Sequence, residues 1–179
     1  MVQAWITAES INGLLEKEGY TGEIDLLSLD MDGMDYWVWK AIEGIRPRVV
    51  VLEYNNALGP ELSLTVPYKD SFVKDSNDIS MLFAQGRRVI NTFVEKPIAD
   101  RIDNYYGASL TAFTKLGKQK GYRLVGCERF GYNAFFVRSD IGKGILPEVA
   151  PAECFHHPFT QYASEVRRQT IANRAWVEV

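Results

Sequence analysis

The hydrophobic pattern at the start of the chain predicts a helix followed by a strand. Apolar residues at i, i+3 and i+4 spacing between Ile11 and Leu15 favour a short amphipathic helix, capped by Thr7 and ending at Gly19. Residues 24–30 (Ile-Asp-Leu-Leu-Ser-Leu-Asp) are mostly apolar, which is typical of a strand buried on both faces. Such strands belong to parallel sheets.

A second helix and strand follow at once. Asp35 is placed to cap a helix over 36–43, and residues 49–54 form another strand of the buried type. Strand, helix and strand within about thirty residues predict one right-handed βαβ unit, and therefore an α/β fold. Beyond it the pattern weakens. Only residues 88–94 look like a strand there, and we interpret 76–103 as an irregular insertion.

Regular patterning returns in the second half of the chain. Ser109 is placed to cap a helix that ends at Gly121, and residues 122–128 and 132–138 are strand-like with a short glycine-containing link between them. These segments predict a mostly parallel sheet of about four or five strands that ends in an antiparallel hairpin, with helices on its faces. We assign residues 1–147 to this domain.

The last residues differ in character. Residues 148–179 are richer in proline, histidine and aromatic side chains and contain a polar helix candidate over 161–174. We expect a C-terminal arm that packs on a neighbouring molecule or on the surface of the domain.

Composition narrows the classes of partner. The chain has 20 Lys plus Arg against 23 Asp plus Glu, a net charge of -3, which argues against a nucleic-acid binder. No apolar run approaches the length of a bilayer span, so no membrane partner is expected. The two cysteines, Cys127 and Cys154, are too few and too distant in sequence to suggest a disulfide framework. A cytoplasmic location is the expectation.

Polar side chains stand where the two parallel strands end. Asp30 and Asp32 follow the first strand, and Glu53, Asn55 and Asn56 follow the second. In open α/β sheets, ligands bind beyond the carboxyl ends of the strands, so these groups would share one rim if the strands are neighbours. They could then act as a general base, hold a substrate hydroxyl or bind a divalent cation. Asp also caps helices and Asn also forms turns, so a purely structural role stays open.

Several of these segments together resemble a known family. The run from Ile24 to Ile42, which contains Asp30-Met31-Asp32-Gly33, and the run Arg46-Pro47-Arg48-Val49-Val50-Val51-Leu52-Glu53-Tyr54-Asn55 resemble the second half of the FkbM-like S-adenosylmethionine-dependent methyltransferases. Residues 105–110 and 121–137 resemble the last helix and terminal hairpin of that family. The resemblance covers residues 6–138, interrupted by the insertion.

The resemblance implies a Rossmann-like methyltransferase half-fold. Asp30 and Asp32 would lie at the catalytic edge of its fourth strand, and Glu53 and Asn55 at the edge of its fifth. The implied reaction is O-methyl transfer from S-adenosylmethionine to a small-molecule or sugar hydroxyl. A magnesium-assisted variant would use Asp30, Asp32 and Asn56.

The chain departs from this family in one respect. The glycine-rich cofactor loop of the family is not found in this sequence. We therefore expect either a truncated chain or a half-fold that completes its sheet with another copy or a partner chain, and that need not be active alone. The corresponding alternative function is a non-catalytic assembly module that forms a homo-oligomer or binds a partner chain.

A second family offers a weaker alternative. Asp30-Met31-Asp32-Gly33 after an apolar strand also resembles the nucleophile loop of haloacid-dehalogenase-like phosphatases, in which the first Asp attacks phosphorus and the second is the acid. That loop normally continues with Thr, whereas Met34 stands here, and no later acidic pair offers a convincing magnesium site.

Overall fold

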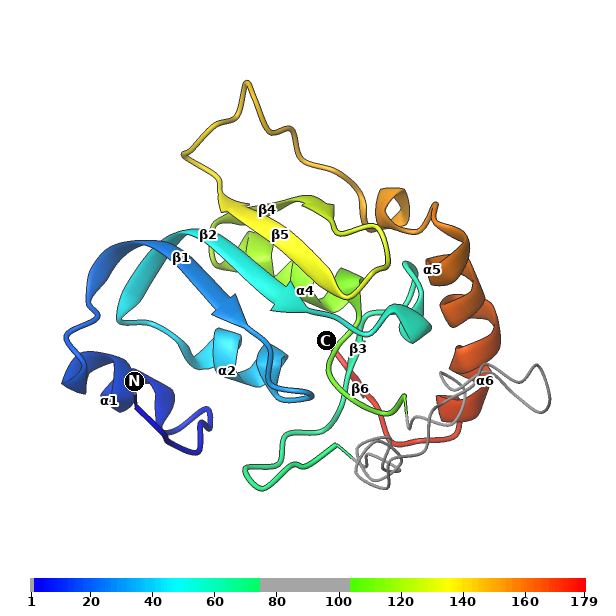
Figure 1. Cartoon of the computed structure of the whole chain (residues 1–179), viewed down its shortest axis with the longest axis horizontal. Coiled ribbons are helices and arrows are strands. Elements are labelled where there is room, and N and C mark those ends of the chain that lie inside the picture. Colours follow the sequence, from blue (N-terminus) through cyan, green and yellow to red (C-terminus); the bar gives the residue numbers. More distant parts are fainter. Residues whose placement is uncertain (1, 75–103) are drawn as a thin grey trace, which may run out of the picture.

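The computed structural model describes residues 2–74 and 104–179 and contains a four-stranded sheet, a small two-stranded sheet and helices (Figure 1). The predicted strand over 88–94 and the predicted insertion over 76–103 lie outside the described residues. The main sheet has the order β1-β2-β5-β4. Its strands are β1 (Gly22–Leu29), β2 (Ile45–Glu53), β4 (Tyr122–Cys127) and β5 (Asn133–Arg138).

Three of these strands run in one direction and the fourth runs against them. β1 and β2 are parallel, and β5 is antiparallel to both β2 and β4. The strand-helix-strand unit and the closing hairpin are both present, and the prediction of an α/β fold is confirmed. The carboxyl ends of β1, β2 and β4 consequently meet at one edge of the sheet, which we call the carboxyl rim.

The second strand begins earlier than the sequence pattern indicates. β2 starts at Ile45 and runs through Pro47, whereas the apolar pattern starts at Val49. Proline is tolerated here because β5 pairs only with residues 49–53, so no neighbouring strand needs an N–H from Pro47 on that side. The Pro47 carbonyl instead accepts a hydrogen bond of 2.7 Å from the Tyr122 hydroxyl.

Two helices cover one face of the sheet and bury the core against it. They are α2 (Asp35–Ala41) and α4 (Leu110–Gln119), and α1 (Ile11–Lys17) lies beside α2. Trp39 of α2 is almost fully buried, with its ring centre 5.3 Å from that of Phe136 and 6.3 Å from that of Phe113. The predicted cap of α4 is confirmed, because Ser109 Oγ accepts the N–H of Ala112 at 3.1 Å.

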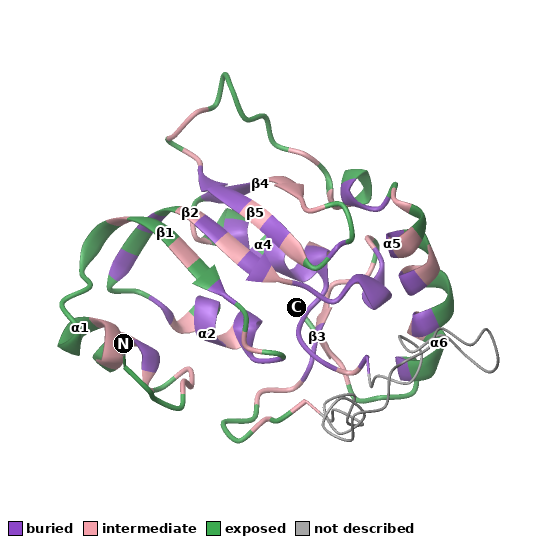
Figure 2. Cartoon of the chain, in the orientation of Figure 1, coloured by how far each residue is buried: buried purple, intermediate pink, exposed green. Residues whose placement is uncertain are grey.

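The prediction that the first strand is buried on both faces is wrong. Figure 2 shows most of β1 exposed or half-buried, and Leu26 in its middle keeps 56% of its surface accessible. The reason is its position, because β1 is an edge strand of the sheet formed by the described residues and has a neighbour only on the β2 side. An apolar run therefore did not guarantee burial.

The C-terminal arm packs on its own domain. Its helical part consists of η3 (Pro151–Cys154), α5 (Pro158–Tyr162), a π-helical turn η4 (Ala163–Arg167) and α6 (Arg168–Ile171). Ile171 is buried against Ala57 and Leu58 of η1 (Asn56–Leu58). The chain then ends in β6 (Val177–Glu178), which pairs with β3 (Leu64–Thr65). Within the described ranges, no helix has the length and apolar character needed to cross a bilayer.

Candidate functional site

The rim brings together side chains from the ends of β1 and β2. Leu29 of β1 is the register partner of Leu52 of β2, so the next residues, Asp30 and Glu53, lie side by side at the carboxyl ends of the two strands. Asp32 and Asp35 follow in the loop and helix after β1 and interact electrostatically with Glu53. The sequence-predicted acidic residues Asp30, Asp32 and Glu53 therefore lie at one rim.

The loop after β1 is held by Asp35. Its carboxylate accepts the N–H of Met31 at 3.0 Å and the N–H of Gly33 at 3.2 Å, so it braces the loop from the first turn of α2. Asp32 has a left-handed backbone with φ of 54°, and its side chain is exposed. Burial raises the pKa of Asp35 to about 6, opposed by the backbone N–H groups that it accepts.

Gly33 permits a close approach to a protein side chain. A Cβ at this position would lie 2.2 Å from the ring of Phe72, a distance that no side chain tolerates. The approach observed is to Phe72, which seals one side of the loop.

Glu53 is the most perturbed carboxyl at the rim. Its side chain is partly buried, and its Oε2 atom has no hydrogen-bond partner among the described residues. The pKa of Glu53 is raised to about 8. Burial is the largest cause; the positive charge of Lys74 opposes it, and the negative charges of Asp30, Asp35 and Asp32 add to it. Protonated and charged forms of this carboxyl thus coexist near neutral pH.

Two rim residues were missed by the sequence analysis. Lys74 Nζ lies 2.6 Å from Asp32 Oδ1 and 3.8 Å from the ring centre of Tyr106. Tyr106 is buried, and burial together with the nearby Glu53 raises the pKa of its hydroxyl. Lys74 stands in an irregular stretch of sequence, so no local pattern marked it. Tyr106 belongs to the Tyr105-Tyr106-Gly107 run that contributed to the family resemblance.

The two asparagines after β2 make structural contacts. The Asn55 amide donates to the carbonyls of Asn104 at 2.7 Å and Tyr106 at 2.9 Å, and its Oδ1 accepts the N–H of Ala57 at 3.0 Å. Its polar atoms are thus bound to backbone. The Asn56 amide donates to the carbonyl of Phe130 at 3.2 Å, in the turn between β4 and β5. Neither amide is directed at the acidic group in these contacts.

The donor set at the rim does not fit a metal ion. Among residues 2–74 and 104–179, no group of three or more His, Cys, Asp or Glu side chains is arranged to hold one. Of the predicted ligands, Asp30 and Asp32 are exposed and Asn56 binds the Phe130 carbonyl. The magnesium-assisted variant and the phosphatase interpretation both require such an ion, so neither gains support from this rim.

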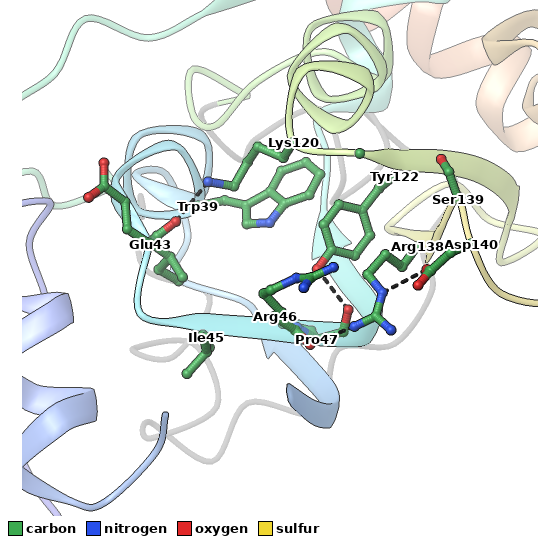
Figure 3. A pocket seen from close by; sticks show the side chains of 12 residues that line it. Trp39, Glu43, Ile45, Arg46, Pro47, Lys120, Tyr122, Arg138, Ser139 and Asp140 are labelled. Atoms are coloured by element: carbon green, nitrogen blue, oxygen red, sulfur yellow. Dashed lines mark hydrogen bonds and ion pairs between the residues drawn. The ribbon is translucent and has the colours of Figure 1, made fainter. Parts of the chain in front are cut away.

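A cavity lies at the opposite edge of the sheet. It measures about 550 Å³ and is lined at the start of β2 and β4 by residues that include Trp39, Arg46, Lys120, Tyr122 and Arg138 (Figure 3). Most of its charges are already engaged within the protein. Lys120 Nζ donates to the carbonyl of Ile42 at 2.7 Å, and Arg138 pairs with Asp140 at 2.7 Å and Glu23 at 2.6 Å.

The charged side chains that line the opposite cavity mostly form ion pairs and hydrogen bonds within the protein. The carboxyl rim, in contrast, has a carboxyl group that can exchange a proton near neutral pH. The rim combines a carboxyl of raised pKa, an ammonium and an aromatic face. No family model, curated protein or solved structure matches the sequence.

Proposed function

We propose that the carboxyl rim is the acceptor side of an O-methyltransferase site of the FkbM type, in which Glu53 takes the proton of a small-molecule or sugar hydroxyl. The observation that carries this proposal is the state of Glu53. Its carboxyl is partly buried, has an oxygen without a partner among the described residues and has a pKa of about 8. A general base is most effective when its pKa lies near the working pH.

The order of elements around the rim supports the same proposal. The strand that ends in Asp30-Met31-Asp32-Gly33 leads into α2 and then into the parallel strand that ends in Glu53. α4 and the β4–β5 hairpin follow in the order that the family resemblance implies. Fold alone does not establish an activity, so the proposal depends on the site and not on the topology.

Each rim residue has a defined part in the proposed proton transfer. An acceptor hydroxyl would donate its hydrogen bond to the Glu53 carboxylate, which receives the proton as the hydroxyl oxygen becomes nucleophilic. Lys74 stabilises the charged form of Glu53 before the transfer. Tyr106 provides the aromatic surface on which Lys74 rests, and Asp32 fixes the ammonium by an ion pair.

S-adenosylmethionine would supply the methyl group. The described residues contain no glycine-rich loop between a strand and a helix, so on their own they do not fit this cofactor. We therefore propose that the rim binds the acceptor and removes its proton, and we assign no contact with the cofactor to the rim.

The proposal is tested by methyl incorporation. The chain is incubated with S-adenosylmethionine carrying a labelled methyl group and a panel of monosaccharides and nucleotide sugars, and products are separated by chromatography. If the chain methylates an acceptor by itself, labelled product should form with the wild type and with Glu43→Gln, which changes an exposed carboxylate just beyond α2, and should fall at least tenfold with Glu53→Gln. Absence of product, with no heat in a calorimetric titration with S-adenosylmethionine, would reject the activity for this chain.

The exposure of β1 favours a second candidate function, a non-catalytic assembly module. The outer edge of β1 is unpaired among the described residues, and Leu26 is largely exposed on it. Edge strands of this kind pair with strands of other chains, and a second copy of this chain is the occupant that we propose. Light scattering after size exclusion should then show a dimer that Leu26→Lys dissociates. A monodisperse wild-type monomer at high concentration would exclude it.

A further inference from the structure

The two cysteines meet in space although 27 positions separate them in sequence. Cys127 is the last residue of β4 and Cys154 is the last residue of η3. Cys127 Sγ donates to the carbonyl oxygen of Cys154 at 3.5 Å, and each thiol shifts the pKa of the other. Both are free thiols. The two cysteines therefore lie at a contact between the end of a sheet strand and the first part of the C-terminal arm.

The two thiols differ in accessibility and in the residues that surround them. Cys127 is partly buried, whereas only 7% of the Cys154 surface is accessible. The buried hydroxyl of Tyr54 lies against the Cys127 thiol, and the Tyr54 ring packs against Phe155 with centres 6.2 Å apart. The neighbouring Cys154 thiol, and after it the Tyr54 hydroxyl, lower the pKa of Cys127 to about 7. Cys127 is thus the accessible thiol, and Cys154 is held behind it.

We propose that Cys127 and Cys154 form a peroxide-reactive pair that closes to an intramolecular disulfide. The Cys127 thiolate attacks one oxygen of hydrogen peroxide, the O–O bond breaks, and Cys127 becomes a sulfenic acid as the other oxygen leaves as water after protonation. Cys154 Sγ then attacks the Cys127 sulfur. The S–O bond breaks, and the departing hydroxide takes the Cys154 proton as a second water. In sum, two thiols and one peroxide give one disulfide and two waters.

The disulfide would change how the arm is attached. The arm is held near β4 by non-covalent contacts between η3 and the strand, including the hydrogen bond from Cys127 to the Cys154 carbonyl. A covalent bond between the same two residues would fix η3 to the strand end beside Tyr54, the residue that follows Glu53. This inference rests on the cysteine pair alone and is independent of the proposed methyl transfer.

The test is oxidation of the whole chain with hydrogen peroxide, followed by mass spectrometry. We expect the intact monomer to lose the mass of two hydrogen atoms, peptide mapping without reductant to link Cys127 to Cys154, and dithiothreitol to restore the starting mass. In Cys154→Ser, which lacks the resolving thiol, we expect Cys127 to accumulate as a sulfenic acid that dimedone traps. Cys127→Ser is the matched control and should give neither product.

Three results would overturn the proposal. The first is a disulfide found only between two molecules. The second is conversion of wild-type Cys127 to sulfinic acid while Cys154 stays reduced. The third is equal dimedone labelling of wild type and Cys154→Ser, which would show that Cys154 does not resolve the sulfenic acid. Circular dichroism of each variant checks that the fold is retained, so loss of structure is not mistaken for loss of reactivity.

Discussion

Lys74 Nζ lies 2.6 Å from Asp32 Oδ1 across 42 positions of sequence. The same ammonium stands 3.8 Å above the ring of Tyr106, so it is held by a carboxylate on one side and an aromatic face on the other. This arrangement places a fixed positive charge beside Glu53, whose burial otherwise disfavours ionisation. The protonation of Glu53 therefore depends on a contact made by a distant segment.

The first prediction concerns the effect of the Lys74 charge on the pKa of Glu53. Replacing Lys74 with methionine removes a charge that favours the carboxylate, so the pKa of Glu53 should rise above its value of about 8. Carbon-13 NMR of the glutamate carboxyl groups, with Glu53 assigned from the Glu53→Gln spectrum, measures it. Lys69→Met changes an exposed lysine nearby and serves as the control. An unchanged Glu53 titration in Lys74→Met would show that the ammonium does not act on this carboxyl.

The second prediction is a pH dependence of stability. The folded chain holds a proton on Glu53 up to about pH 8, whereas the unfolded chain releases it near the ordinary value of 4.5. Between these values the folded state binds more protons, so the contribution of Glu53 is fully present below about pH 4.5 and is lost as pH rises through 8. We expect Glu53→Gln and the wild type to have the same free energy of unfolding at pH 4.5. At pH 8 the free energy of unfolding of Glu53→Gln should be higher by about 1–2 kcal/mol.

Urea denaturation at the two pH values measures this difference. Glu43→Gln, an exposed substitution, should follow the wild type at both. A Glu53→Gln variant that is less stable than the wild type at pH 8 would contradict the expected sign, because it would mean that the folded protein favours the charged carboxyl.

The third prediction tests whether Asn55 stabilises the fold or takes part in the reaction. Asn55→Ala leaves two buried carbonyls and one buried N–H without their partners, and we expect a loss of about 2–3 kcal/mol in the free energy of unfolding. The matched control is Asn12→Ala. Asn12 also bridges two backbone groups, but nearer to solvent, so about 1 kcal/mol is expected there. If Asn55→Ala instead keeps its stability but loses methyl transfer, Asn55 takes part in the reaction.

Local signals predicted much of the fold. The helix after Ser109 was predictable because its cap, its apolar face and its terminal glycine all lie within a dozen residues. The hairpin was predictable because its turn and both strands are contiguous. The neighbouring placement of Asp30 and Glu53 followed from the strand-helix-strand unit, since such strands usually pair.

The parts that sequence reasoning missed are contacts between distant segments. Nothing in the sequence near Lys74 indicates that it meets Asp32 and Tyr106, because these contacts depend on how the segment after β3 folds toward the rim. The same applies to Cys127 and Cys154, whose distance in sequence argued against a pairing and whose contact is made by the arm folding back on β4. The apolar composition of β1 likewise cannot reveal that the strand lies at an edge.

The last prediction concerns the reactivity of Cys127. A thiol reacts as its thiolate, so its alkylation by iodoacetamide should increase with pH along a curve with a midpoint of about 7, below the range of an ordinary cysteine. Cys154, which is buried, should react more slowly. Tyr54→Phe removes a hydroxyl that lowers the pKa of Cys127, so the midpoint should move upward, whereas Tyr20→Phe, at an exposed tyrosine, should leave it unchanged. Mass spectrometry of quenched time points gives both rates, and an unmoved midpoint in Tyr54→Phe would show that the hydroxyl does not stabilise the Cys127 thiolate.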